Sequence, residues 1–264
     1  MNFADYKTLL FTRRGRVLEI TMNRPDKLNA VDEVMHAELA RVFVDASNDP
    51  DCDIVVLTGA GRAFSAGGDI DWMQRMIDDP ASFEKTAREG KQIVFSLLDC
   101  EKPVIAKLNG HATGLGATIA LFCDVIFASD KAKIGDPHVC VGFVAGDGGA
   151  VIWPQLIGYA RAKEFLMTGD LMTAEEAAKI GLINHAVAAA DLDARVAEFA
   201  DRLAAGATKA IRWSKMSANI GLKQLAHSIM DASLAYEAMS NVSADHQEAV
   251  NAFREKRAPT FTGR

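Results

Sequence analysis

The chain has 264 residues, 49% of them hydrophobic, and its 29 basic and 35 acidic residues give a formal net charge of −6. This length and apolar content can bury one substantial core. The acidic balance disfavours a nucleic-acid partner, which needs clustered positive charge. Neither a signal-peptide layout nor an apolar run of membrane-spanning length is present, so we expect no membrane partner and a cytoplasmic location.

The first third of the chain predicts buried strands alternating with helices. Strand-like runs at 7–12 and 17–22 flank a short turn. Asp32 is expected to cap an amphipathic helix that ends near residues 48–50. A buried strand at 54–58 leads into a glycine-rich loop, and a second helix is expected at 82–98.

The remainder continues this pattern and then becomes helical. A strand is expected at 104–108, a helix at 116–123, and short strands at 125–128 and 132–134. Thr173 and Glu176 form a capping-box pattern that predicts a helix ending before Gly181. From about residue 191 the chain is alanine-rich and has no strand signals, which predicts a C-terminal helical region with apolar faces available for subunit contacts.

The four cysteines, at positions 52, 100, 123 and 140, form no C-x-x-C pair and no metal-binding spacing. Each sits in or beside an apolar run. The sequence therefore predicts buried, reduced thiols and no metal site.

Two glycine-rich loops, at 64–70 and 109–116, lie at predicted strand–loop–helix junctions. Unpaired N–H groups at a helix N-terminus favour a negatively charged ligand, and glycine lets the backbone approach it closely. Neither loop matches a phosphate-binding or dinucleotide-binding fingerprint. Taken singly, each could equally be a tight structural turn.

Together with three other strings, these loops resemble the crotonase (enoyl-CoA hydratase/isomerase) superfamily over essentially the whole chain. The matching strings, in order, occupy residues 23–30, 63–70, 102–110, 123–124 and 252–261. The resemblance implies an α/β fold, a crotonase-like spiral of strand-strand-helix units with a C-terminal all-helical region. It also implies a spiral core over 1–200 holding an acyl-CoA pocket, and a region over 201–264 that completes the CoA site and builds a homotrimer or hexamer.

The resemblance also places the site residues. It puts an oxyanion hole at the backbone N–H groups of Gly68 and Leu115, where fixed donors would stabilise a thioester oxyanion. Leu115 stands where the family usually has glycine, and its donor survives this change if φ stays negative. No tightly bound cofactor is expected, because coenzyme A is part of the substrate. The implied CoA-binding residues are Lys27, Leu28, Ala30, Ala66, Asp69, Ile70, Phe253 and Lys256.

The chain departs from the family at the two glutamates that hydratases use on water. The first position is Thr118 and the second is His138. His138 is followed nine residues later by Asp147, and an imidazole with a carboxylate partner is a common general base. This His–Asp pattern resembles the superfamily branch that includes oxocamphor hydrolase, which cleaves C–C bonds. His138 could instead be a hydrogen-bonded core residue, and Asp147 a helix cap.

Three functions therefore stay open. The first is an acyl-CoA-transforming lyase or isomerase that forms or quenches an enolate, with His138 and Asp147 moving the proton. The second is a hydrolase that cleaves a C–C bond in a β-diketone or β-ketoacyl-CoA. The third is a non-catalytic acyl-CoA-binding protein that has lost its acids.

Overall fold

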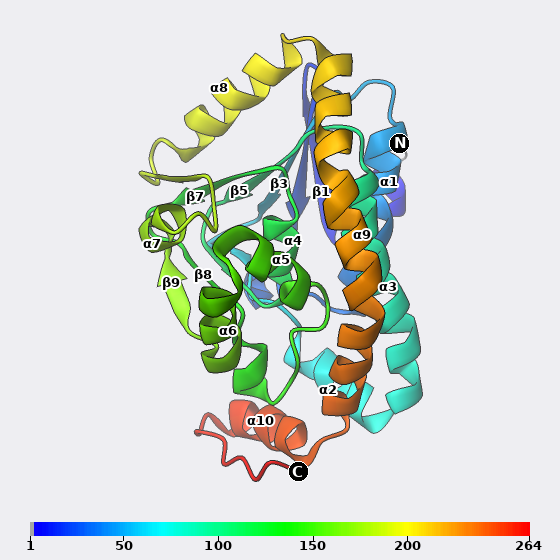
Figure 1. Cartoon of the computed structure of the whole chain (residues 1–264), viewed down its shortest axis with the longest axis vertical. Coiled ribbons are helices and arrows are strands. Elements are labelled where there is room, and N and C mark those ends of the chain that lie inside the picture. The colour runs from blue at the N-terminus through cyan, green and yellow to red at the C-terminus, as the bar shows by residue number, and fades with distance from the viewer. Residues whose placement is uncertain (1–2) are drawn as a thin grey trace.

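The computed structural model describes residues 3–264, which fold around two β-sheets (Figure 1). The large sheet has the order β1-β2-β3-β5-β7-β10, and the small sheet has the order β4-β6-β8-β9. The strands are β1 (Leu9–Arg14), β2 (Val17–Met22), β3 (Ile54–Gly59), β4 (Ala63–Ser65), β5 (Val104–Leu108), β6 (His111–Thr113), β7 (Val125–Ser129), β8 (Lys133–Gly135), β9 (Leu171–Thr173) and β10 (His185–Val187).

Helices cover both sheets. They are α1 (Glu33–Asn48), α2 (Ile70–Asp78), α3 (Phe83–Asp99), α4 (Leu115–Leu121), α5 (Gly149–Ile157), α6 (Tyr159–Thr168), α7 (Ala174–Lys179), α8 (Leu192–Ala204), α9 (Thr208–Asn241) and α10 (Ala244–Glu255). A short 3-10 helix, η4 (Pro137–Val141), follows β8. No helix within residues 3–264 is both long and apolar enough to span a bilayer.

The strands form a repeating unit. In each of the pairs β3–β4, β5–β6 and β7–β8, the first strand joins the large sheet and the second joins the small sheet. Helices follow each pair, and the strands β2, β3, β5, β7 and β10 run parallel. The expected α/β spiral of strand-strand-helix units is therefore confirmed.

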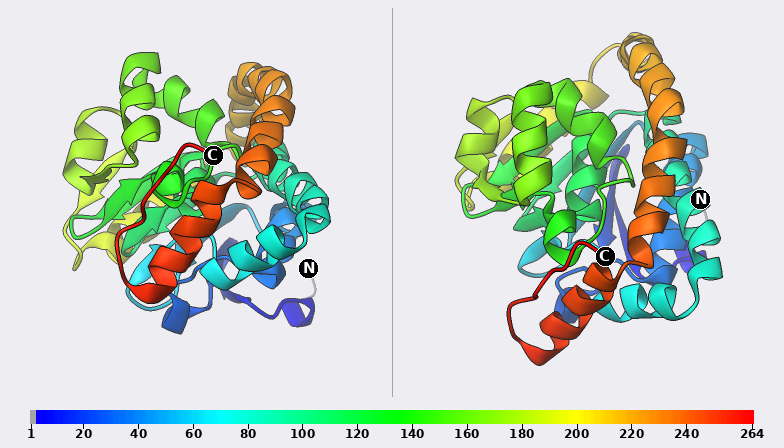
Figure 2. Two further views of the ribbon diagram at one scale, coloured as in Figure 1. Left: turned by 90° about the horizontal axis from the view of Figure 1, so that it is seen from below. Right: turned by 60° about the horizontal axis from the view of Figure 1, so that its bottom comes forward.

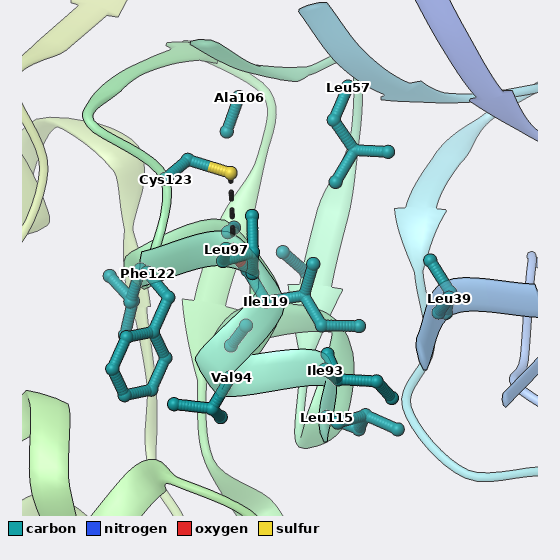
Figure 3. Packing of buried hydrophobic residues seen from close by; sticks show 14 of the residues in the cluster. Leu39, Leu57, Ile93, Val94, Leu97, Ala106, Leu115, Ile119, Phe122 and Cys123 are labelled. Atoms are coloured by element: carbon teal, nitrogen blue, oxygen red, sulfur yellow. Dashed lines mark hydrogen bonds between the residues drawn. The ribbon is translucent and has the colours of Figure 1, made fainter. Parts of the chain in front are cut away.

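Burial follows from this layering. All six residues of β3 are buried, as expected for a parallel strand covered on both faces. α8 packs on β3, β5 and β7, while α1 packs against α3. α4 is buried along its whole length, and Figure 3 shows its place in the core. The core residues labelled there include Leu39, Ile93, Leu97, Leu115 and Ile119.

The last quarter of the chain is helical, as predicted. The 34-residue α9 packs along α3 and α5, and α10 packs against α2 and η4 (Figure 1). The C-terminal tail then turns back beside α10, where the N–H of Thr262 donates to Asp245 at 2.7 Å (Figure 2). The predicted boundary at residue 200 falls inside α8, and the division into 1–200 and 201–264 units stays a prediction.

Most of the expected elements are present. Asp32 caps α1 by accepting a hydrogen bond from the Met35 N–H at 2.9 Å, and the Thr173–Glu176 capping box is formed. The strands β4, β6, β9 and β10 were not expected. Each has three residues, too few to show alternation, and β4 and β6 lie within the two predicted loops. The expectation of four buried thiols is wrong for Cys140, which is exposed.

The buried side chain of Asn29 forms hydrogen bonds that hold together the segments before the first glycine-rich loop. Asn29 is fully buried and has a left-handed backbone, φ 54°. Its Oδ1 accepts from the Arg24 N–H at 2.9 Å, and its Nδ2 donates to the carbonyls of Ala60 and Ala63 at 2.9 Å each. Asparagine tolerates this backbone conformation better than most residues.

We therefore expect Asn29→Ala to lower the free energy of unfolding by about 2–4 kcal/mol, because it leaves buried polar groups unpaired in a strained turn. Urea unfolding measures this loss. The exposed Asn48, the last residue of α1, is the matched control, and Asn48→Ala should change stability by less than about 0.5 kcal/mol. Equal effects of the two substitutions would contradict the role assigned to Asn29.

Candidate active site

The two glycine-rich loops meet each other. Gly67 and Gly114 have φ of 84° and 54°, a region that favours glycine. A Cβ on Gly67 would lie 2.9 Å from the Thr113 carbonyl oxygen and 3.6 Å from the Gly114 Cα. The small sheet causes this approach, because β4 and β6 run parallel and each ends at one of the loops.

The residues that follow these glycines hold the candidate oxyanion amides. Leu115 is the first residue of α4, so its N–H has no partner within the helix. Over residues 3–264, the N–H groups of Gly68 and Leu115 donate to no protein acceptor. Leu115 is not among the residues with positive φ, so its backbone meets the condition set from the sequence. Both residues line one cavity of about 40 Å³.

His138 and Asp147 line the same cavity and lie close together. His138 sits in η4, and its Nε2 is 3.6 Å from Asp147 Oδ2. Its Nδ1 is hydrogen-bonded to Asp136. Thr118, on α4, donates to Asp147 Oδ1 at 3.2 Å. The residues at the two family glutamate positions, 118 and 138, therefore both contact the Asp147 carboxyl group.

Glu237 on α9 completes the cluster. Its carboxyl group, the Asp147 carboxyl group and the His138 ring each present an atom within 4.8 Å of the others. Glu237 is 5% exposed, and its Oε2 has no hydrogen-bond partner within the described residues. This trio is the one set of buried side chains in residues 3–264 with the spacing of metal ligands. We call His138, Asp136, Asp147 and Glu237 the acidic cluster.

Sequence reasoning did not identify Asp136 and Glu237. The contact of Asp136 with the His138 ring depends on the geometry of η4. Glu237 could have been identified from the sequence, because it follows the buried positions Ala226, Met230 and Leu234 at helical spacing. A glutamate on an otherwise apolar helical stripe is a candidate functional residue.

Burial and mutual charge determine how protons are distributed in the acidic cluster. Burial alone would lower the pKa of His138, but Asp136 and Asp147 outweigh it and raise that pKa to about 10. Burial raises the pKa of Asp147. Burial and then the Asp147 charge raise the pKa of Glu237 well above its usual value. At neutral pH the imidazole is therefore protonated, and burial favours the protonated form of the Glu237 carboxyl group.

The rest of the cavity lining is mostly hydrophobic. It comprises side chains from α2, α3, α9 and the loop after η4, with His36 and Thr86 as further polar residues. The hydrophobic members are Trp72, Met73, Met76, Phe83, Phe143 and Leu234. We call this space the acyl cavity, after the apolar chain that such a lining accommodates.

A second, larger cleft of about 360 Å³ adjoins the acyl cavity. The two share Gly68, Met73 and His138 as lining residues. Of the predicted CoA-binding residues, those that line the cleft are Lys27, Leu28, Ala30, Ala66, Asp69, Ile70 and Phe253. Lys256 does not line it; that residue is exposed and ends α10 with φ 55°.

The cleft wall is built by two segments that run side by side. The Ala66 N–H donates to the Leu28 carbonyl at 3.0 Å, and the Val31 N–H donates to the Gly67 carbonyl at 2.7 Å. Asp69 caps α2 by accepting hydrogen bonds from the N–H groups of Asp71 and Trp72. These contacts fix the loop that carries Gly68 against the segment that carries the cleft residues.

This fold thus places a small cavity beside a larger cleft, and the two share Gly68, Met73 and His138. The family model described as enoyl-CoA hydratase/isomerase matches residues 12–264. The chain therefore belongs to the enoyl-CoA hydratase/isomerase family.

Individual proteins agree with this assignment. A crotonyl-CoA hydratase of Syntrophomonas wolfei is 32% identical, over 97% of this chain and 98% of its own. A short-chain-enoyl-CoA hydratase of Clostridium acetobutylicum is 34% identical, over 96% and 97%. The crystal structure of an enoyl-CoA hydratase/isomerase from Mycobacterium paratuberculosis superposes with a TM-score of 0.90 at 36% identity, covering 94% of this chain and 99% of that one.

The charge state of His138 can be tested directly. Histidine-selective ¹⁵N NMR at pH 8 should show its ring protonated on both nitrogens, since the neighbouring carboxylates raise its pKa to about 10. Asp136→Asn should lower the pH at the midpoint of the His138 titration. The His138→Gln variant identifies which ¹⁵N signal belongs to His138.

His246 is the internal control for this measurement. Burial lowers its pKa, so its ring should be neutral at the same pH. A neutral His138 ring at pH 8 in the wild-type protein would contradict the assigned charge state.

Proposed function

We propose that the protein transforms short-chain acyl-CoA thioesters, adding water to a 2-enoyl-CoA or removing it from the hydroxyacyl product. One observation carries the proposal: a single cavity is lined by Gly68, Leu115, His138, Asp147 and Glu237, and it adjoins a cleft lined by seven of the eight predicted CoA residues. The cavity volume of about 40 Å³ favours a short acyl group. The names of the relatives from Syntrophomonas and Clostridium support the same class.

In this proposal the Gly68 and Leu115 amides hold the thioester oxygen. Addition of water to the β-carbon of an enoyl thioester moves an electron pair onto that oxygen and forms an enolate. Donors that are already fixed stabilise this charge without reorganisation, and removing one such donor typically costs about 3–4 kcal/mol. The absence of any protein acceptor for either N–H in residues 3–264 supports this assignment.

The carboxyl groups of Asp147 and Glu237 perform the proton transfers. Asp147, whose raised pKa makes it a stronger base than an ordinary aspartate, takes a proton from the attacking water. Glu237 gives its proton to the α-carbon, which collapses the enolate. His138 serves as the fixed positive charge between the carboxyl groups. This role differs from the general base expected from the sequence, because a protonated ring cannot accept the proton.

The adjoining cleft holds coenzyme A in this proposal. Lys27 offers an exposed cation at its edge, 3.8 Å from Asp71, for the nucleotide phosphates. The homotrimer or hexamer implied by the family resemblance stays a prediction, which the mass of the assembly in solution decides. Exposed hydrophobic residues of α9, among them Trp213 and Ile220, support a subunit contact there.

A second candidate is hydrolytic C–C cleavage of a β-diketone or β-ketoacyl-CoA. The contact of His138 with Asp147 favours it, because the Asp147 carboxylate, held by the protonated ring, would activate a water for attack on a carbonyl. The same amides would then hold first the tetrahedral adduct and then the enolate leaving group. Product analysis separates the candidates, since hydration conserves the carbon skeleton and hydrolysis divides it.

The first test is turnover of crotonyl-CoA and its short-chain homologues, with acetoacetyl-CoA as the probe of C–C cleavage. Asp147→Asn should lower kcat about 10²–10⁴-fold while thioester binding persists, because it removes the base. Asp231→Asn, on the exposed face of α9, is the control and should leave kcat unchanged. Micromolar binding without turnover or α-carbon deuterium exchange would instead identify a non-catalytic binder.

The oxyanion hole can be tested at Leu115. Proline is tolerated at the first position of a helix, so Leu115→Pro removes the N–H with little cost to α4. We expect kcat to fall about 10²–10³-fold. Leu115→Ala, which keeps the N–H but shortens the same side chain, should lose much less. If the two variants lose activity equally, the Leu115 amide is not a donor to the substrate.

A further inference from the structure

His36 is a polar residue of the acyl cavity that the proposed chemistry does not use. It lies on α1, is 3% exposed and lines the cavity together with residues from α2, α3 and α9. Its Nδ1 is 2.9 Å from Glu89 Oε2. Among the hydrogen bonds of residues 3–264, none joins His36 to the acidic cluster. His36 and the acidic cluster are therefore two separate polar regions of the cavity wall.

The contact with Glu89 determines which nitrogen of the His36 ring carries a proton. A carboxylate oxygen only accepts hydrogen bonds, so the Nδ1 of His36 carries the proton. The ring also packs on Trp72, with 5.0 Å between centroids. These two contacts orient Nε2, which has no hydrogen-bond partner among the described residues.

A glycine leaves space beside that nitrogen. A Cβ added to Gly90 of α3 would lie 3.9 Å from His36 Nε2 and 3.9 Å from Leu234 Cδ2, in ordinary contact with both. Gly90 lies inside α3, where alanine would give a more stable helix. The glycine therefore leaves open space but lowers the helix propensity of this segment. The opening is lined on one side by a nitrogen and on the other by a hydrocarbon side chain.

A purely hydrocarbon chain would leave this nitrogen unpaired and buried, which is unfavourable. We propose that the acyl cavity receives an acyl group bearing an oxygen function, which His36 Nε2 holds by a hydrogen bond. This proposal rests on the proposed function, since it specifies the acyl part of the thioester. A neutral ring accepts from a hydroxyl group, and a protonated ring donates to a carbonyl or carboxylate oxygen.

A hydrogen bond of this kind discriminates strongly. A hydrophobic pocket separates substrates that differ by one methylene only about 10–200-fold, whereas a site built to pair a polar group rejects the analogue without it far more effectively. His36 is therefore assigned as a specificity-determining residue that contacts the oxygen function of the acyl group.

The test compares saturated short-chain acyl-CoA thioesters in matched pairs with the same number of acyl carbons. In each pair one acyl chain is unsubstituted, and the other carries a terminal hydroxyl group, a ketone at the penultimate carbon or a terminal carboxylate. Calorimetry gives Kd for wild type, His36→Leu, His36→Gln and Gly90→Ala. Wild type should bind at least one oxygenated member about 10-fold or more tightly than its hydrocarbon partner. His36→Leu should abolish that ratio, His36→Gln should restore part of it, and Gly90→Ala should reduce it by filling the space beside Nε2.

The outcomes separate this inference from the proposed function. If wild type binds both members of every pair equally, or if His36→Leu weakens both equally, the assignment of His36 is overturned while thioester binding stands. If no thioester binds at all, the proposed function itself fails. Thermal unfolding of each variant identifies any loss due to misfolding, and Gly90→Ala, which suits its helix, keeps the test decisive if His36→Leu does not fold.

Discussion

The site depends on one buried positive charge. His138 is the single basic side chain paired with the carboxyl groups of the acidic cluster in residues 3–264. Three buried carboxylates could not be ionised together in so small a space, because each would lose its hydration and repel the others. The imidazolium contacts the carboxyl groups of both Asp136 and Asp147, and burial favours the protonated form of Glu237. The cluster thus retains protons at a pH where isolated carboxyl groups would have lost them.

The fold brings these groups together from distant parts of the chain. Asp136 and His138 follow β8 of the small sheet, Thr118 lies on α4, and Glu237 lies on α9. Each is held by an element packed in the same core, so the cluster is as rigid as the core itself. The two amides proposed as oxyanion donors have the same origin, since β4 and β6 pair in parallel and deliver both loops to one point. The geometry of the candidate site is a consequence of sheet pairing.

The sequence predicted the regular part of this arrangement well. Strands β2 and β5 have the expected bounds, and Asp32 and Thr173 cap the helices assigned to them. The glycine-rich strings and their order were sufficient to identify the family. The residues expected at the cleft gather there with the exception of Lys256.

The contacts that the sequence did not predict depend on how segments distant in the chain pack together and on the local geometry of short turns. β4 and β6 have no periodic signal, because three residues cannot show alternation, and they are defined by their pairing in the small sheet. The bond from His138 to Asp136 joins residues two apart and depends on the turn in η4. Glu237 lies 90 residues beyond Asp147 in the chain, a separation over which no local pattern acts. The charge of His138 followed from these neighbours and could not be read from the residue itself.

The two departures from the family pattern are best understood as one coupled change. Thr118 and His138, the two positions at which the family resemblance expects glutamate, both contact the carboxyl group of Asp147. A glutamate at position 118 would add a further carboxyl group beside Asp147, with no second cation to compensate it. In the proposed mechanism the carboxyl groups of Asp147 and Glu237 take the place of such a glutamate, and the His138 ring supplies the positive charge that they share.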